Sequence, residues 1–363
     1  MSDRYEYGKL KEVVALIIEK NGFSAADGAK VAEVMLCSDL YGIESHGLQR
    51  LHLYMAGIEG GRINKNAKMR ICKETPVSMT IDADAGLGQP AGIFAMEKAI
   101  EKAKTTGFGM VIVTNSNHYG ISGYYSMLAA KAGLFGMSMT NTVSLVVPTH
   151  GKTPMLGTNP IAVSMPASPT IFHMDISTAV VAAGKMEVYA KAEKPLPEGW
   201  SVGSDGKVNT SAGEFLAIRR ERRDGGLLPL GGVGETWGGH KGFGLSIVVE
   251  LMTGIMGMAT PSFFVRRTPD KELVSHVFQA IDYGMFGDRQ TIEDNFSSYL
   301  QMLRDSRKAD DQERIYIHGE KERESRERVL KDGVYMQPAT RAEVVAACEK
   351  VGIDYEKYIV PVG

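Results

Sequence analysis

Between residues 77 and 115 the spacing of apolar residues changes twice, and this change does most to limit the fold. The segments 77–86 (VSMTIDADAG) and 109–115 (GMVIVTN) have the pattern of strands, and 91–107 (AGIFAMEKAIEKAKTTG) has that of a helix. Short apolar runs separated by Gly and Pro continue through 145–290, with a further helix expected over 242–257. The sequence therefore predicts an α/β (α+β) body.

The first sixty residues predict helices that pack together. Apolar residues at helical spacing mark the segment 7–36, which Gly22 interrupts and Ser24 caps anew. A third helix is expected over 46–61. Later in the chain, 193–213 has the composition of a long exposed loop, and the charged stretch 304–331 that of a solvated helical face.

Composition excludes several classes of partner. At 363 residues and 44% hydrophobic, the chain is long enough for two or three lobes, and its net charge is −2 without a basic, aromatic-rich cluster. Neither nucleic acid nor a membrane surface is therefore expected as a partner. The most apolar window, 243–259, contains Glu250 and predicts a core helix rather than a membrane span.

The cysteines and the N-terminus indicate a cytoplasmic protein. Three cysteines, far apart and without a CxxC pair, are typical of reduced thiols, and the first residues lack the apolar segment of a secretory signal. No HExxH or EF-hand pattern occurs, so no metal is expected.

A glycine-rich turn at 86–92 (GLGQPAG) imitates a dinucleotide-binding motif. Its spacing is G-x-G-x-x-x-G, Pro90 replaces a backbone N–H that a phosphate needs, and no acidic residue ends the next strand. The turn therefore predicts a tight strand-to-helix connection and no ordinary Rossmann site.

Three polar side chains gather in the segment 44–54 (ESHGLQRLHLY). His46 and Arg50 are four residues apart and would share one face of a helix, with Ser45 beside them. A guanidinium can bind a carboxylate through two parallel hydrogen bonds, and a histidine side chain can gain or lose a proton near neutral pH. The combination suits a small hydroxy or oxo acid; alternatively, Arg50 pairs with a surface acid and His46 merely opens a helix.

His118 lies in an abruptly polar turn, 115–120 (NSNHYG), directly after the β-branched residues 111–113. Side chains at the carboxyl end of a buried strand commonly project into a cleft. His118 is therefore a second candidate for proton transfer, unless the loop itself satisfies its ring.

Two further segments have the composition of ligand sites. Seven glycines surround His240 and Lys241 in 230–246, without the spacing of a Walker loop. The segment 172–184 (FHMDISTAVVAAG) places Asp175, Ser177 and Thr178 at the end of an apolar strand, where Asp175 either accepts hydrogen bonds from a ligand hydroxyl or caps the helix that follows.

Taken together, these segments resemble the malate/L-lactate dehydrogenase family of NAD(P)-dependent 2-hydroxyacid oxidoreductases, which is unrelated in fold to the Rossmann-type enzymes of similar name. The matching segments, in family order, are ESHGLQRL (44–51), GLGQPAG (86–92), NSNHYG (115–120), LGTNP (156–160), MDIST (174–178), GGHKGFGLS (238–246) and HGEKERESRERVLKDG (318–333). Each motif is weak alone, and their joint order and spacing is specific. The chain departs from the family at His318, where Pro is usual.

The resemblance implies a homodimer whose site lies at a domain and subunit boundary. Residues 1–118 with 288–363 would form a helical substrate and dimerisation region, and 119–287 a non-Rossmann cofactor domain on a largely antiparallel sheet. His118 looks like the proton acceptor and His46 like the proton donor of some reductases, with Ser45 and Arg50 on the substrate side. The implied contacts with NAD or NADP are Thr142, Asp175, Ile176, Ser177, Lys241, Gly242, Gly319 and Glu320.

The resulting functional expectation is hydride transfer between a nicotinamide and a small 2-hydroxy acid, most simply malate to oxaloacetate. One alternative is an NAD(P)H-dependent reductase of another 2-oxo acid or of a cyclic imino acid. A different class, a non-redox phosphate-ligand binder or transferase, would need a Walker or acid-rich magnesium motif, and the sequence shows neither. The choice between NAD and NADP stays open.

Overall fold

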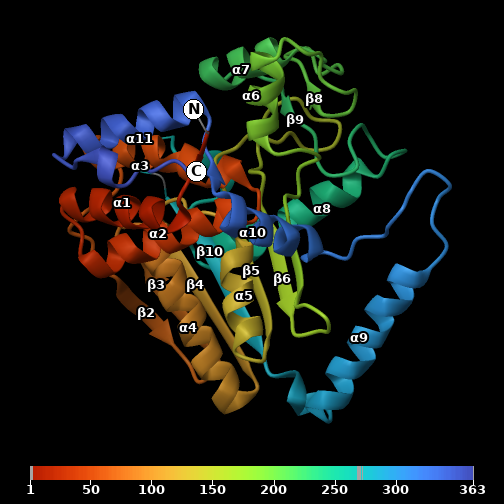
Figure 1. The fold of residues 1–363 in the computed structure, drawn as a ribbon. Coiled ribbons are helices and arrows are strands. Elements are labelled where there is room, and N and C mark those ends of the chain that lie inside the picture. The colour runs from red at the N-terminus through yellow and green to blue at the C-terminus, as the bar shows by residue number, and fades with distance from the viewer. Residues whose placement is uncertain (1–2, 268–270, 272, 363) are drawn as a thin grey trace.

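The computed structural model describes residues 3–267, 271 and 273–362, and its centre is a seven-stranded sheet (Figure 1). The strand order is β2-β3-β4-β10-β5-β6-β7. The strands are β2 (Arg70–Glu74), β3 (Ser78–Asp82), β4 (Phe108–Ser116), β5 (Phe135–Thr140), β6 (Ile161–Met165), β7 (Phe172–Ile176) and β10 (Val274–Ile281). Only the pair β3–β4 is parallel, and every other pair in this sheet is antiparallel. The predicted α/β class and the largely antiparallel sheet are confirmed.

The parallel pair follows from the strand–helix–strand pattern of 77–115. Helix α4 (Gly88–Thr106) connects β3 to β4 and packs on one face of the sheet, next to α5 (Gly123–Lys131). Successive side chains of a strand point to opposite faces. Val111 and Val113 of β4 therefore join the core under α4 and α5, whereas Ile112 joins a smaller core on the other face.

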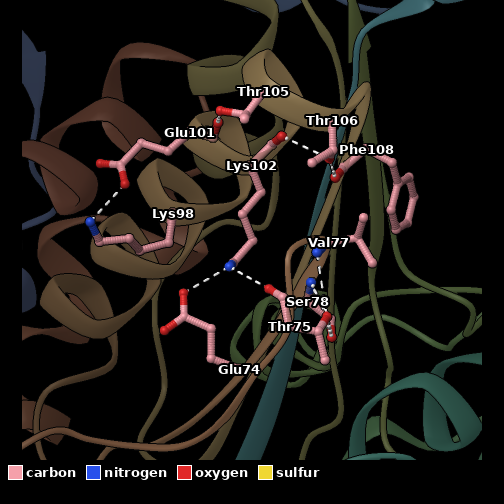
Figure 2. Close-up of polar contacts among 10 residues, drawn as sticks. All are labelled: Glu74, Thr75, Val77, Ser78, Lys98, Glu101, Lys102, Thr105, Thr106 and Phe108. Carbon is pink, nitrogen blue, oxygen red and sulfur yellow. Dashed lines mark hydrogen bonds and ion pairs between the residues drawn. The ribbon is translucent and has the colours of Figure 1, made fainter.

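Polar contacts fix the outer edge of the sheet to α4, as Figure 2 shows. The Nζ of Lys102 donates to the Oε1 of Glu74 at 2.8 Å and to the carbonyl oxygen of Thr75 at 2.8 Å. Lys98 bonds Glu101 within the helix. The two contacts of Lys102 attach α4 to the turn between β2 and β3. This turn lies at the end of the sheet opposite to the one that carries His118.

The N-terminal helices form a second core with the C-terminal segment. They are α1 (Tyr7–Lys20), α2 (Ala25–Leu40) and α3 (Leu51–Glu59), and α11 (Pro338–Lys350) packs against them. As predicted, α1 ends before Gly22, and the Ser24 hydroxyl caps α2 by accepting from the N–H of Asp27. The expected helix over 46–61 is shorter, because α3 begins only at Leu51.

A small lobe stands above one end of the sheet (Figure 1). It contains α6 (Ala183–Lys191), α7 (Ala212–Glu221) and the two-stranded sheet of β8 (Ser201–Val202) and β9 (Gly226–Leu227). The prediction of an exposed loop over 193–213 is therefore wrong in its middle, where β8 is buried against β9. Apolar residues around Phe215 form the core of this lobe.

The apolar window 243–259 covers the other face of the large sheet. Helix α8 (Gly239–Glu250) continues into a π-helical turn, η3 (Leu251–Ile255), and Val249 and Met252 pack against Ile112 and Val277. The expected helix is present, but the prediction that it is buried in a core is wrong for its outer face, where Leu245, Ile247, Val248, Leu251 and Ile255 are exposed. Among the described residues no helix is long and apolar enough to cross a bilayer.

Helix α9 (Arg289–Asp305) stands away from the body in Figure 1, and only Leu300 of its described residues is buried. The chain returns to the body at α10 (Glu320–Asp332). The prediction of a solvated helical face over 304–331 is wrong at Glu320, which is buried between Arg304 and Arg314.

The short elements are β1 (Arg4–Tyr5), β11 (Val334–Tyr335), η1 (Glu44–His46), η2 (Leu48–Arg50), η4 (Ser262–Phe264), η5 (Tyr283–Phe286) and η6 (Tyr355–Lys357).

The expected division at residue 118 stays a prediction. The large sheet takes β2 to β4 from the first segment and β5, β6, β7 and β10 from the second, so both segments share one sheet.

Candidate active site

A cavity of about 300 Å³ lies where the N-terminal helices, the ends of β4, β5 and β7 and the small lobe meet. Seven of the predicted site residues line it: Ser45, His46, Arg50, His118, Thr142, Asp175 and Ser177. The residues at 45–50 and His118, far apart in the sequence, thus share one cavity.

The turn that carries His118 is held by the glycine-rich turn at 86–92. The amide of Asn117 donates to the carbonyls of Ala85 at 2.6 Å and Gly86 at 2.9 Å. A Cβ on Gly88 would lie 2.2 Å from the carbonyl oxygen of Asn117 and 2.7 Å from that of His118. The turn that imitates a Rossmann motif therefore serves as a close backbone support for His118, which agrees with the predicted tight connection.

The ring of His118 contacts two polar groups through Nδ1 and a second imidazole through its face. Its Nδ1 lies 2.7 Å from the hydroxyl of Tyr54, and the backbone N–H of Gly120 approaches the same atom at 3.3 Å. The His46 ring stacks beside it, with 5.5 Å between centroids. Sequence reasoning missed Tyr54, although it lies in the first turn of α3, four residues after Arg50.

Burial keeps both imidazoles uncharged. It lowers the pKa of His118 well below 6.5, and the charges of His46 and Arg50 act in the same direction. Burial, followed by the charge of Arg50, lowers the pKa of His46 to about 4. Both rings are therefore neutral at pH 7, whereas a guanidinium such as that of Arg50 keeps its charge.

The segment 44–50 differs from the expected helix. Two 3₁₀ turns, η1 and η2, are separated at Gly47, so His46 and Arg50 do not share a helical face. The buried carboxylate of Asp39 accepts from the N–H of Leu48 at 2.9 Å, and a Cβ on Gly47 would lie 1.9 Å from that carboxylate. Tertiary contacts thus bring the two side chains into the cavity.

Ser45 connects the two cavity residues of this segment. Its hydroxyl lies 3.0 Å from Nδ1 of His46, and its carbonyl accepts from Nε of Arg50. His46 therefore has its Nδ1 engaged, and the guanidinium of Arg50 is oriented by the backbone.

A buried polar network supports Thr142. Asn159, in a left-handed conformation (φ +40°), donates to Glu250 at 2.7 Å, and its Oδ1 lies 3.3 Å from the N–H of Thr142. The other carboxylate oxygen of Glu250 accepts from the N–H of Ser262 at 3.0 Å. Glu250, the acid within the apolar window, thus stabilises a cavity wall, a role that its position in a helical pattern does not reveal.

Asp175 caps a helix other than the expected one. It accepts from the N–H of Gly123 at 2.7 Å, at the start of α5, while α6, the helix that follows Asp175, has no side-chain cap. Burial raises the pKa of Asp175 to about 6. Nearby, the hydroxyl of Ser177 donates to the carbonyl of Thr158 at 3.0 Å.

The other five predicted residues are absent from the described lining of this cavity: Ile176, Lys241, Gly242, Gly319 and Glu320. Ile176 is the last residue of β7, and Gly319 and Gly242 lie on segments that contact β7 or the residues just after it. A Cβ on Gly319 would lie 3.0 Å from that of His173, whose N–H donates to the carbonyl of His318 at 3.1 Å. Gly242 packs on the backbone of Leu230, whose N–H donates to Thr178. Both carboxylate oxygens of Glu320 bond arginines, Arg304 and Arg314.

The residues present fit a nicotinamide cofactor better than a metal. In the part of the chain that the structure describes, no three His, Cys, Asp or Glu residues gather as metal ligands would. The cavity instead offers the hydroxyls of Thr142 and Ser177 and the Asp175 carboxylate beside two neutral imidazoles. This mixture of neutral donors and acceptors suits an amide-bearing ring and a ribose.

Comparison with known proteins gives one family. The family model described as malate/L-lactate dehydrogenase matches residues 5–345. The chain is 41% identical to the malate dehydrogenase of Pyrococcus horikoshii over 95% of each chain, and 34% identical to the L-sulfolactate dehydrogenase of Methanocaldococcus jannaschii over 96% of this chain and 97% of the other. The crystal structure of malate dehydrogenase from Entamoeba histolytica is similar with a TM-score of 0.93 at 32% identity, covering 97% and 99% of the two chains.

Proposed function

We propose a role for each side chain of the cavity from one premise: this chain belongs to the malate/L-lactate dehydrogenase family. It is an NAD(P)-dependent oxidoreductase of small 2-hydroxy acids. One observation carries the assignment of roles. Two neutral imidazoles, His46 and His118, and one guanidinium, Arg50, line the same cavity.

His118 is the proton acceptor and Arg50 the carboxylate clamp in this proposal. The guanidinium binds the substrate carboxylate, which orients C2 and its hydroxyl toward His118. A bound nicotinamide would supply the hydride acceptor. The hydroxyl proton of the substrate passes to the unprotonated ring nitrogen of His118, whose Nδ1 lies 2.7 Å from the Tyr54 hydroxyl. His46, whose Nδ1 lies 3.0 Å from the Ser45 hydroxyl, stacks beside His118 and lines the same cavity. In the direction of reduction, protonated His118 returns the proton, and the neutral His46 ring positions the substrate by a hydrogen bond.

The residues that would hold the cofactor fall into two groups. Thr142, Asp175 and Ser177 line the cavity and would contact the cofactor there, whereas Ile176, Lys241, Gly242, Gly319 and Glu320 are not part of the described lining. Gly319 begins α10 in a left-handed conformation (φ +99°), and the N–H of the next residue, Glu320, donates to the carbonyl of Ile317 at 3.1 Å. These are the residues that we assign to NAD or NADP.

Malate is the first substrate to test, with oxaloacetate as its product. We expect purified enzyme to oxidise reduced nicotinamide with oxaloacetate, followed by the loss of its absorbance. The panel should pair NADH and NADPH with oxaloacetate, pyruvate, sulfopyruvate and a cyclic imino acid. Turnover of the imino acid alone would replace the proposal by an imine reductase, and turnover of none would refute it.

A homodimer completes the proposal. Apolar side chains of α8 and η3 are exposed: Leu245, Ile247, Val248, Leu251 and Ile255, with Met256 directly beyond them. On α9, Tyr299 and Met302 are exposed, the latter by 70%, and this helix stands away from the body (Figure 1). Exposed apolar side chains in this number are typical of an interface, and a second copy of the chain is the partner that we propose.

Sedimentation tests the dimer. We expect a dimer for the unsubstituted chain and a monomer for Ile255→Asp with Met302→Asp. The control is Val188→Asp, an exposed apolar residue of α6, which should leave the mass unchanged. A monomeric unsubstituted chain would contradict the proposal.

We also assign the enzyme to the cytoplasm. Cys37, Cys72 and Cys348 are free thiols in the structure, as expected of a reducing compartment. Localisation of a tagged chain by fractionation tests this, and enrichment outside the cytoplasm would contradict it.

A further inference from the structure

A second cavity of about 210 Å³ adjoins the first and is rich in arginine. It lies between the C-terminal end of α7 and the segment after η4. Five arginines line it: Arg219, Arg222, Arg223, Arg266 and Arg267. One carboxylate, Asp224, is part of the described lining, and it is engaged by Thr153 at 2.8 Å and Lys152 at 3.6 Å.

The two cavities share part of their walls. Val143, Leu145, Arg219 and Arg266 line both, so these two arginines lie between the surface cavity and the site that holds His118. The charge of Arg266 is among those that lower the pKa of His118, after burial and the charges of His46, Arg50 and His276. The charge of Arg219 lowers the pKa of Arg50, to which burial contributes most.

The arginines of the second cavity have different neighbours. Arg219 forms an ion pair with Glu187 at 2.9 Å, and Arg223 forms one with Glu221 at 2.8 Å. Arg267 stacks on the ring of Phe263. The backbone of Arg266 is fixed in a left-handed conformation (φ +58°), and its carbonyl accepts from Arg222 at 3.2 Å. This bond holds the α7 end and the Arg266 segment together at the boundary between the cavities.

A monocarboxylic 2-hydroxy acid needs only the Arg50 clamp. A second acidic group on C3 or C4, whether a carboxylate or a sulfonate, needs another cation, because burying an unpaired charge is costly. Besides Arg50, the arginines in the described lining of the first cavity are Arg62, Arg219 and Arg266. Arg62 donates to the carbonyl of Leu53 at 3.2 Å and does not line the arginine-rich cavity.

We infer that Arg266, with Arg219 beside it, binds a second acidic group of the substrate, so that the enzyme selects dianionic 2-hydroxy and 2-oxo acids, which enter through the arginine-rich cavity. This inference rests on the proposed function and adds to it the substrate class and the residue that selects it. The positive lining also raises the local concentration of dianions at the entrance.

The test compares substrates that differ only in the second acidic group. Oxaloacetate and sulfopyruvate carry it, and 2-oxobutyrate does not. For Arg266→Gln we expect KM for both dianions to rise about 10- to 100-fold, as for a lost charge-assisted bond. The kcat/KM for 2-oxobutyrate should change less than about twofold, and Arg266→Lys should restore part of the affinity for dianions.

Arg62→Gln is the matched control, since it removes another arginine of the same cavity. We expect it to leave the ratio of oxaloacetate to 2-oxobutyrate efficiency unchanged. Equal losses on all substrates in Arg266→Gln, no loss on any, or a selective loss in Arg62→Gln instead would overturn the inference. A change confined to the KM for NADPH would also overturn it, and would assign Arg266 to the cofactor phosphate.

A binding measurement separates this inference from the proposed function. By calorimetry, succinate should bind the unsubstituted enzyme more tightly than butyrate, and Arg266→Gln should remove that difference. If no 2-oxo acid is turned over but this difference is present, the dehydrogenase proposal fails and the anion site stands. If the enzyme is active but succinate binding is unaffected by Arg266→Gln, the anion site fails alone.

Discussion

The hydroxyl of Tyr54 lies 2.7 Å from Nδ1 of His118, although the two residues are 64 positions apart in the chain. A hydroxyl both donates and accepts, so it remains a partner of Nδ1 whichever ring nitrogen carries the proton. The contact therefore directs Nε2 toward the cavity before and after proton transfer.

Tyr54→Phe should lower kcat/KM for malate oxidation about tenfold, close to the worth of one buried hydrogen bond. Steady-state kinetics measures this. The same substitution in a His118→Ala background should have little further effect, because the group that Tyr54 orients is then absent. Additive losses would show that Tyr54 acts independently of His118.

His118→Ala should lower kcat by about 10²–10⁴-fold, the usual contribution of a general base. Binding of reduced nicotinamide, followed by calorimetry, should be preserved, since the substitution removes no group that we assign to the cofactor. Unchanged turnover would exclude His118 from proton transfer.

Arg50→Lys should raise the KM for the acid by about tenfold or more, because a point charge does not replace a two-bond fork. Kinetics with oxaloacetate at fixed cofactor concentration measures it. An unaltered KM would mean that another residue binds the C1 carboxylate.

Gly88→Ala should destabilise the protein by about 1–3 kcal/mol, as overpacking does, and should also lower activity. The new Cβ would lie 2.2 Å from the backbone of Asn117, so the turn that carries His118 must move. Urea unfolding measures the loss. Gly8→Ala is the control, because nothing lies within 4 Å of its Cβ; it should be neutral or stabilising and fully active. A stable and active Gly88→Ala would contradict the supporting role of this turn.

His276 should make stability depend on pH. Its ring is buried between Thr140 at 2.7 Å and Ser116 at 3.0 Å, and burial lowers its pKa to about 3 from 6.5. Below pH 6.5 the unfolded chain therefore binds a proton that the folded chain excludes, and stability falls as the pH falls. This histidine alone should remove about 2 kcal/mol of unfolding free energy between pH 7 and 5.

Urea unfolding of His276→Gln at both pH values isolates this contribution. The variant should be less stable than the unsubstituted protein at pH 7, and the gap should narrow by about the same amount at pH 5. A gap that is independent of pH would mean that His276 titrates alike in the folded and unfolded chains.

Local sequence determined the elements and the identity of most chemical groups. Apolar spacing is a property of neighbouring residues, so it predicted α1, α2, α4, β4 and the existence of the helix that contains Glu250. The motif order was sufficient for the family, and it singled out Ser45, His46, Arg50 and His118, which the cavity brings together. The spacing of 86–92 was also sufficient to exclude a Rossmann turn.

The tertiary structure decided how those groups meet, because contacts between distant segments have no local signal. Gly47 and the Asp39 carboxylate interrupt the first turns of the helix expected over 46–61, yet His46 and Arg50 both line one cavity. Asp175 caps α5 rather than the helix that follows it, since β7 runs beside the start of α5. Three features became recognisable only in the packed chain: the contact of Tyr54 with His118, the support that Glu250 gives to the cavity wall through Asn159, and the arginines that line both cavities.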